Sequence, residues 1–213
     1  MTVGHADYQG DVNIGFFGIV TEETVLLAEG FKKSEFFGDS QDIRLAGTDL
    51  IGIFAAGNSN GVLVPEVITE HEEEVLEEKG IDFKVLETDY TALGNLVLCN
   101  DNGCFISKNL EDRKEEISEF LDVPVESGTV AGLDIPGSCG AATENGVLLH
   151  RNASETELRK VEEALQAEGD VGTVNFGSPY VHSGVLADSE DLLVGNDTTG
   201  PEVQRIQESL DLL

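Results

Sequence analysis

The side chains best suited to covalent chemistry in this sequence are three cysteines and four histidines. Cys139 and His150 flank a predicted tight turn, so a thiol and an imidazole could meet across a hairpin as a nucleophile and its base. Cys99 and Cys104 form no Cys-x-x-Cys pair, and the chain lacks the cysteine spacing of a zinc site. We therefore expect three reduced, partly buried thiols, and a catalytic Cys139–His150 pair is the alternative.

The sequence contains no recognisable metal-binding or phosphate-binding loop motif. The string NDNG (100–103) lacks the twelve-residue ligand order of a calcium loop, which ends in Glu. The string GNDTTG (195–200) is not followed by the Gly-Lys-Ser/Thr of a phosphate-binding loop. We expect neither a metal nor a cofactor.

Charge is the most extreme property of the chain, because 42 acidic and 12 basic residues give a net charge of −30. The acidic residues are spread over the whole length, and 40% apolar residues exclude a disordered acidic chain. This composition is typical of extreme halophiles, in which molar salt shortens the Debye length to about 3 Å and screens self-repulsion. The basic residues form only small clusters, which argues against DNA binding and against RNA wrapping.

The sequence also bears on location. No apolar run approaches the length of a membrane span, and the opening MTVGHADYQG (1–10) has no signal-peptide core. We therefore expect a cytoplasmic protein with no membrane partner.

Five hairpin-type turns recur at intervals of 37 to 45 residues. They begin at residues 21, 58, 100, 143 and 188 with the strings TEET, NSNG, NDNG, TENG and DSED. Six residues before each turn stand Gly15, Gly52, Gly94, Gly137 and His182. Glycine inside a strand marks a close approach of backbones, so we expect these positions in strands crowded around a central axis. Such a period is typical of solenoids and propellers.

Each turn is followed by an apolar segment and then, in four units, by a predicted helix. A helix start is indicated by an N-cap residue with an acidic residue three positions later. These pairs are Thr69–Glu72, Asn109–Asp112, Ser154–Glu157 and Thr199–Glu202. In the first unit FKKSEFFGDS (31–40) lacks such a cap, so its helix should be short or degenerate. Further strands are predicted to begin at Asp42, Asp82, Asp122 and Asp170.

Each unit therefore consists of strand, tight turn, strand, helix and strand, which predicts the α/β class. The fifth unit lacks its last strand, and residues 2–8 could supply it and so close a ring that buries the sheet edges. We predict a single domain over residues 1–213. Its five repeats have approximate bounds 11–47, 48–90, 91–133, 134–178 and 179–213, with residues 2–8 closing the ring.

Several strings resemble one known family, and the resemblance covers essentially the whole chain. They are IGIFAAGNSNGVLVP (51–65), LGNLVLCND (93–101), GTV (128–130) and GTVNFGS (172–178). These strings are similar to translation initiation factor six, the ribosome anti-association factor of archaea and eukaryotes, and the acidic composition resembles a haloarchaeal member. The resemblance implies the pentein fold, a closed five-bladed α/β propeller with pseudo-fivefold symmetry.

The same resemblance implies a monomeric translation initiation factor that has no enzyme activity and no cofactor. Such a factor binds the intersubunit face of the large (50S) ribosomal subunit, near the sarcin–ricin loop. Its contacts there are with ribosomal proteins, whose basic surfaces suit an acidic partner. It blocks joining of the small (30S) subunit by steric occupancy and takes part in late large-subunit maturation.

The alternative function comes from the same fold, which also hosts guanidine-modifying enzymes such as arginine deiminases and amidinotransferases. Those enzymes resemble one another in a nucleophilic cysteine late in the chain, a histidine and paired carboxylates. No cysteine follows Cys139 in this sequence. We therefore expect a binding protein rather than an enzyme.

The candidate ribosome-binding residues are four asparagines, Asn58, Asn95, Asn100 and Asn175. The first three lie in or beside the turn-proximal strands of consecutive units, so a ring would gather them near one end of its axis, and Asn175 is placed with them. The alternative is that such asparagines fill turn positions and bond their own backbone. We prefer that alternative for Asn60 and Asn102, whereas Asn95 has no turn to stabilise.

Overall fold

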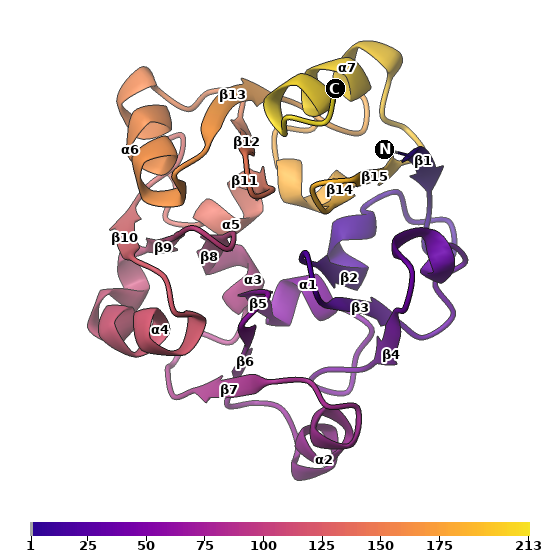
Figure 1. The fold of residues 1–213 in the computed structure, drawn as a ribbon, viewed down its shortest axis with the longest axis vertical. Coiled ribbons are helices and arrows are strands. Elements are labelled where there is room, and N and C mark those ends of the chain that lie inside the picture. The colour runs from indigo at the N-terminus through magenta and orange to yellow at the C-terminus, as the bar shows by residue number, and fades with distance from the viewer. Residues whose placement is uncertain (1) are drawn as a thin grey trace.

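The computed structural model describes residues 2–213, apart from the side chains of residues 34 and 35. Its fifteen strands form five sheets of three strands each. Figure 1 shows these sheets arranged around a common centre, with the longer helices on the outside. The α/β class predicted from the sequence is therefore confirmed.

All five sheets have the same topology, in which the middle strand pairs antiparallel with the inner strand and parallel with the outer one. The first two sheets contain β2 (Gly18–Val20), β3 (Val25–Ala28) and β4 (Gln41–Ile43), then β5 (Ala56–Asn58), β6 (Gly61–Pro65) and β7 (Phe83–Leu86). The third and fourth contain β8 (Val97–Cys99), β9 (Cys104–Ser107) and β10 (Val125–Gly128), then β11 (Gly140–Ala142), β12 (Gly146–His150) and β13 (Glu168–Gly172). The fifth contains β14 (Val185–Ala187), β15 (Asp191–Gly195) and β1 (Thr2–Ala6).

The fifth sheet joins the two ends of the chain. Strand β1 pairs in parallel with β15, in a register that runs from Thr2 opposite Asp191 to Ala6 opposite Gly195. The predicted pairing of the N-terminal segment with the last unit is confirmed, and the strand proper ends at Ala6. The last unit therefore obtains its outer strand from the beginning of the chain (Figure 1).

The middle strands form the core. Every residue of β3, β6, β9 and β12 is buried. A strand covered on both faces carries a continuous apolar run rather than an alternating pattern. This explains why strings such as VLLA (25–28) and CFIS (104–107) contain no charged residue.

The outer helices pack outside the sheets. They are the 3-10 helix η2 (Ser34–Phe37), α2 (Glu70–Glu78), the 3-10 helix η3 (Lys108–Arg113), α4 (Lys114–Leu121), α6 (Glu155–Leu165) and α7 (Gly200–Ser209). The capping boxes predicted at Thr69, Ser154 and Thr199 are all present. The short helix predicted for the first unit is confirmed as the single 3-10 turn η2. No helix in the part of the chain that the structure describes is long and apolar enough to cross a membrane.

The helix start predicted at Asn109 is wrong. The hydroxyl of Ser107 accepts a hydrogen bond from the Asn109 N–H at 3.2 Å, so Ser107 is the cap. The segment then winds as the 3-10 helix η3, and the α-helix begins only at Lys114. A hydroxyl two residues earlier in the chain therefore outcompetes the weaker Asn–Asp pair.

Short helices line the centre of the molecule, and we call them the axial helices. They are η1 (Ile14–Phe17), α1 (Ile51–Phe54), α3 (Leu93–Leu96), α5 (Pro136–Cys139) and η4 (Val181–Gly184). The four glycines and His182 that precede the turns by six residues lie in these helices. The prediction that they lie in strands is therefore wrong. Each axial helix contacts the next, and η4 contacts η1.

The axial glycines allow this contact because a side chain would collide with the neighbouring backbone. A Cβ atom on Gly52 would lie 2.0 Å from the carbonyl oxygen of Gly15, and one on Gly94 would lie 1.9 Å from that of Gly52. His182 takes the fifth position, and its Nε2 lies 3.0 Å from the carbonyl oxygen of Gly52. Desolvation lowers the pKa of His182 below its ordinary value, so the ring is neutral at pH 7.

We predict that Gly94→Ala destabilises the protein by about 3 kcal/mol, because the new methyl group must displace backbone rather than a flexible side chain. The matched control is Gly200→Ala at the first position of α7, where no atom lies within 4 Å of the added Cβ. The control should be neutral or slightly stabilising, since alanine favours a helix. Denaturant midpoints in molar potassium chloride measure both effects. Equal midpoints for the two variants would contradict the role given to the axial contacts.

Candidate functional site

The five units place two kinds of surface at opposite ends of the inner strands. Each inner strand follows an axial helix and ends at a hairpin turn. The axial helices contact one another, and neighbouring hairpin turns are joined by hydrogen bonds, as from Ser59 to Asp101 and from Ser189 to Glu22. We therefore distinguish an axial end, formed by the axial helices, from a hairpin end, formed by the turns.

Asn58 and Asn100 lie at the hairpin end, where both are buried. The amide nitrogen of Asn58 donates to the carbonyl oxygen of Leu121 at 3.0 Å and to that of Asn100 at 3.3 Å. The amide nitrogen of Asn100 donates to the carbonyl oxygens of Thr143 at 2.8 Å and Leu165 at 3.1 Å. Each side chain therefore joins its own turn to the next turn and to the end of the next outer helix.

Asn60 and Asn102 do not bond their own backbone, contrary to the interpretation preferred above. The amide nitrogen of Asn60 donates to the carbonyl oxygen of Leu121 at 2.8 Å, and that of Asn102 donates to Glu144 at 2.8 Å. The turns are held instead by Asn58 and Asn100, whose side-chain oxygens accept the N–H groups of Asn60 and Asn102. These turn asparagines connect neighbouring units.

Asn95 lies at the axial end, in α3. It is half-buried, and its side-chain oxygen accepts a hydrogen bond from the Ser138 hydroxyl at 2.7 Å. Its amide nitrogen has no hydrogen-bond partner among residues 2–213. Because β8 separates Asn95 from Asn100, the two residues lie at opposite ends of one strand. Asn95 thus offers an unused donor pair at the axial end.

Asn175 belongs to a third place, the turn Val174–Ser178 that leads toward η4. Its amide nitrogen donates to the carbonyl oxygen of Val12 at 3.0 Å, and its side-chain oxygen accepts from the Thr198 hydroxyl at 3.1 Å. The structure therefore brings Asn58 and Asn100 together. The prediction that all four asparagines gather at one end is wrong.

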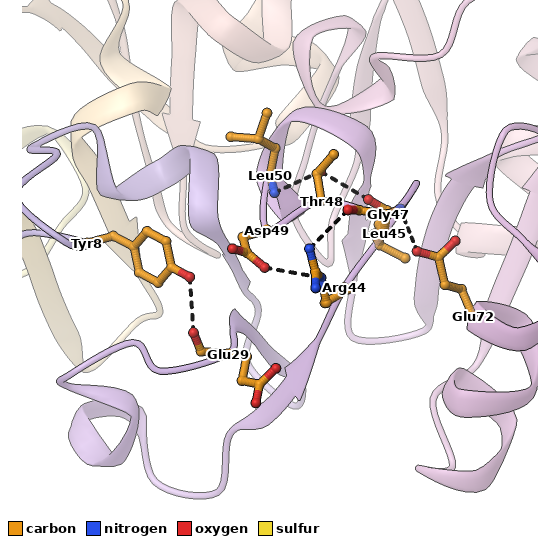
Figure 2. Close-up of polar contacts among 9 residues, drawn as sticks. All are labelled: Tyr8, Glu29, Arg44, Leu45, Gly47, Thr48, Asp49, Leu50 and Glu72. Atoms are coloured by element: carbon orange, nitrogen blue, oxygen red, sulfur yellow. Dashed lines mark hydrogen bonds and ion pairs between the residues drawn. The ribbon is translucent and has the colours of Figure 1, made fainter.

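A carboxylate clamp recurs in the turns that precede axial helices, and Figure 2 shows the one formed by Glu72. One oxygen of Glu72 accepts the Gly47 N–H at 2.8 Å, while the other accepts the Thr69 N–H at 2.8 Å in the capping box. Arg44 braces the same turn, since it donates to the Gly47 carbonyl oxygen at 3.0 Å and pairs with Asp49 at 3.3 Å (Figure 2). One side chain therefore caps α2 and fixes a turn of the preceding unit.

The clamp is repeated twice more with the same geometry. The Gly132 N–H lies 2.8 Å from Glu157, and the Gly177 N–H lies 2.8 Å from Glu202. In all three clamps the glycine precedes the glutamate by 25 residues. The capping boxes are evident from the sequence, whereas the clamps are not predicted, although their constant spacing is a signal in the sequence. Phe176, which lies in the third clamped turn and is 83% exposed, was not among the predicted site residues either.

Hydrogen bonding keeps the three clamp carboxylates ionised. Burial by itself would raise their pKa values, but the N–H and hydroxyl donors around them outweigh it. The pKa of Glu157 falls to about 2, and those of Glu72 and Glu202 are also lowered. The charges of these residues therefore stabilise the fold at neutral pH.

The residues suited to covalent chemistry do not form a catalytic pair. Cys139 is fully buried, and burial, with a smaller effect of Glu157, raises the pKa of its thiol to about 12. The Nδ1 of His150 accepts the Asn152 N–H at 3.1 Å, and its ring packs edge-on against Tyr180. The thiol is therefore protonated, and the imidazole is engaged elsewhere.

The centre of the molecule offers little room for a substrate. A cavity of about 90 Å³ lies between the inner strands and is lined by Gly57, Cys99, His182 and their neighbours. Ligand pockets usually measure about 300–1,000 Å³. Among the described residues, no group of three or more His, Cys, Asp or Glu side chains is arranged to hold a metal ion.

We predict that the clamps make the protein sensitive to acid. Because the pKa of Glu157 is depressed from 4.5 to about 2, its contribution is complete above about pH 4.5 and is lost as the pH falls toward 2. Glu157→Ala should cost about 2 kcal/mol at pH 7, through the lost cap and the lost charged hydrogen bonds. It should also flatten the fall in stability between pH 4.5 and 2.

The measurement is chemical denaturation at several pH values. Glu163→Ala, an exposed change on the same helix, is the control. Identical pH profiles for the wild type and Glu157→Ala would refute the role of this clamp.

Comparison with known proteins places the chain in a family. The model of the eIF-6 family matches residues 3–209. Translation initiation factor 6 of Pyrococcus abyssi is 38% identical, with 100% of both chains covered. Translation initiation factor 6 of the haloarchaeon Haloquadratum walsbyi is 35% identical, with 98% of this chain and 96% of that protein covered. The resemblance seen in the sequence is confirmed: the chain belongs to the eIF-6 family of non-enzymatic translation initiation factors.

Proposed function

We propose that the chain binds the large (50S) ribosomal subunit on its intersubunit face and sterically prevents joining of the small (30S) subunit. The observation that carries the proposal is the match to the eIF-6 family over residues 3–209, together with full-length relatives named translation initiation factor 6. A role in late large-subunit maturation belongs to the same proposal. The protonated Cys139 thiol and the small central cavity argue against the guanidine-modifying alternative.

The fold proposed for this function is a pentein, a closed five-bladed α/β propeller with pseudo-fivefold symmetry that forms one domain over residues 1–213. The five equivalent sheets, the pairing of β1 with β15 and the contact of η4 with η1 support it. The repeats would have the bounds given above. A closed ring of this kind is rigid, and rigidity suits a protein that acts by occupying a surface.

The proposed partners are ribosomal proteins near the sarcin–ricin loop. A net charge of −30 repels the phosphates of ribosomal RNA and attracts basic protein surfaces. We further propose that the factor is a cytoplasmic monomer of haloarchaeal type, because an acidic surface of this density requires molar salt for screening.

Within the proposed binding surface, Asn95 is the best placed of the four asparagines, because its amide donors are free at the axial end. Asn175 lies in a turn that leads toward the axial helix η4, and its side chain is engaged with Val12 and Thr198, so its part in binding would be to hold that turn in place. Asn58 and Asn100 are buried and have their donors engaged with neighbouring units. Their part in binding would be to hold the units in place.

We predict that Asn95→Ala weakens binding to isolated 50S subunits by about 1–2 kcal/mol, roughly tenfold, if this amide is central to the interface. Thermal stability should change by no more than about 1 kcal/mol, since a single hydrogen bond to Ser138 is lost. Sedimentation with 50S subunits, and with 50S plus 30S subunits, in high potassium chloride gives both binding and inhibition of joining.

The control is Glu163→Gln on the exposed face of α6. If this control weakens binding as much as Asn95→Ala, the wrong surface has been assigned. If the wild type does not bind 50S subunits, the proposed function itself is wrong.

A further inference from the structure

Phe176 has an unusual exposure. Its side chain is 83% exposed, whereas the other exposed aromatic residues, Tyr90 and Tyr180, are 41% and 44% exposed. A single exposed apolar residue is common and needs no explanation by itself. Phe176 differs from such residues in its backbone conformation and in the hydrogen bonds that hold its turn.

The backbone at this turn is held in a conformation that bulky residues avoid. Asn175, Phe176 and Gly177 have φ angles of 45°, 60° and 102°, so three consecutive residues are left-handed. For an aromatic residue a positive φ is an outlier, and such strain persists only where the surroundings impose it. Outliers of this kind cluster at functional sites.

Hydrogen bonds from neighbouring side chains impose this left-handed conformation on the turn. Glu202 accepts the Phe176 N–H at 3.2 Å and the Gly177 N–H at 2.8 Å, and it also accepts the Thr173 hydroxyl at 2.7 Å. Asn175 is fixed through Thr198, whose hydroxyl accepts the Asn175 N–H at 3.1 Å. The turn is therefore rigid, while the ring at its tip has few contacts with the rest of the protein.

The other clamped turns show that the fold does not require an aromatic residue here. They close between Leu45 and Thr48 and between Val130 and Leu133, with alanines at φ of 51° and 54° before the glycine. The turn that carries Phe176 closes between Val174 and Ser178 and is one residue longer. In this longer turn Phe176 occupies the position directly before the glycine, which alanine occupies in the other two turns.

The charge around the turn selects the kind of partner. No lysine or arginine lies between Lys160 and Arg205 in the sequence, and Arg205 itself is paired with Asp170. The neighbouring loop exposes Asp197. A phosphate-rich RNA surface would be repelled here, and a protein pocket with a basic rim would be attracted. An aromatic side chain on a preformed turn enters such a pocket with little loss of conformational freedom.

We propose that Phe176 is a preorganised anchor that inserts into an apolar, basic-rimmed pocket of a protein on the large ribosomal subunit. This inference rests on the proposed function and deepens it, because it names the residue and the class of partner at the contact. The ring supplies the apolar contact, and the surrounding acidic residues orient it.

The experiment compares the wild type, Phe176→Ala and the control Tyr90→Ala in equilibrium sedimentation with purified 50S subunits in molar potassium chloride. Alanine already occupies the equivalent conformation at Ala46 and Ala131, so Phe176→Ala should fold with an unchanged thermal midpoint. Its affinity should fall at least tenfold, which is about 1.4 kcal/mol. Tyr90→Ala should change affinity less than twofold.

The partner class is tested by replacing Phe176 with photoreactive p-benzoylphenylalanine and irradiating the complex. A crosslink to a basic ribosomal protein supports the proposal, and a crosslink to ribosomal RNA alone overturns it. If the wild type binds 50S subunits and Phe176→Ala binds them with the same affinity, Phe176 is not an anchor. The proposed function is not contradicted by that result. Failure of the wild type to bind 50S subunits overturns both.

Discussion

The structure depends on how closely five short helices can approach one another at its centre. Where Gly52 and Gly94 stand, the carbonyl oxygen of the preceding axial helix occupies the space of a Cβ atom. The inner strands begin directly after these helices, so the spacing of the helices sets the spacing of the sheets. The close approach of these backbones therefore sets how closely the inner strands can pack around the centre.

Some of the carboxylates that make this chain acidic also connect neighbouring units. Three capping-box glutamates each hold the start of an outer helix and a turn of the preceding unit. Their depressed pKa values show that backbone N–H groups and hydroxyls replace the lost hydration. Connections between units are therefore made by carboxylates at these turns and by asparagine amides at the hairpin end.

The two ends of the molecule differ in whether the amide groups of their asparagines have hydrogen-bond partners. At the hairpin end the amides of Asn58 and Asn100 are fully engaged in joining units. At the axial end Asn95 keeps a donor available, and outside both ends the turn Val174–Ser178 exposes Phe176 to solvent. In the function proposed above, these free groups are the proposed contacts with the large ribosomal subunit.

The sequence alone determined the repeat, the α/β class, the pairing of residues near the N-terminus with the last unit, three capping boxes and the family. These features follow from local patterns: turn residues, apolar periodicity and N-cap spacing act over a few positions. The glycines at constant phase were also found, but their placement in helices was not, because a four-residue helix has no periodicity to detect.

Only the tertiary structure decided which polar side chains are free. The sequence places Asn58 and Asn100 at the starts of turns and Asn95 directly after Gly94. It does not show that Leu121 and Leu165, more than 60 residues away, supply carbonyl acceptors to Asn58 and Asn100. The second role of Glu72 and the exposure of Phe176 likewise depend on groups that the fold brings together from distant parts of the chain. Hydrogen bonding and burial are properties of such long-range neighbours, and the local pattern does not specify them.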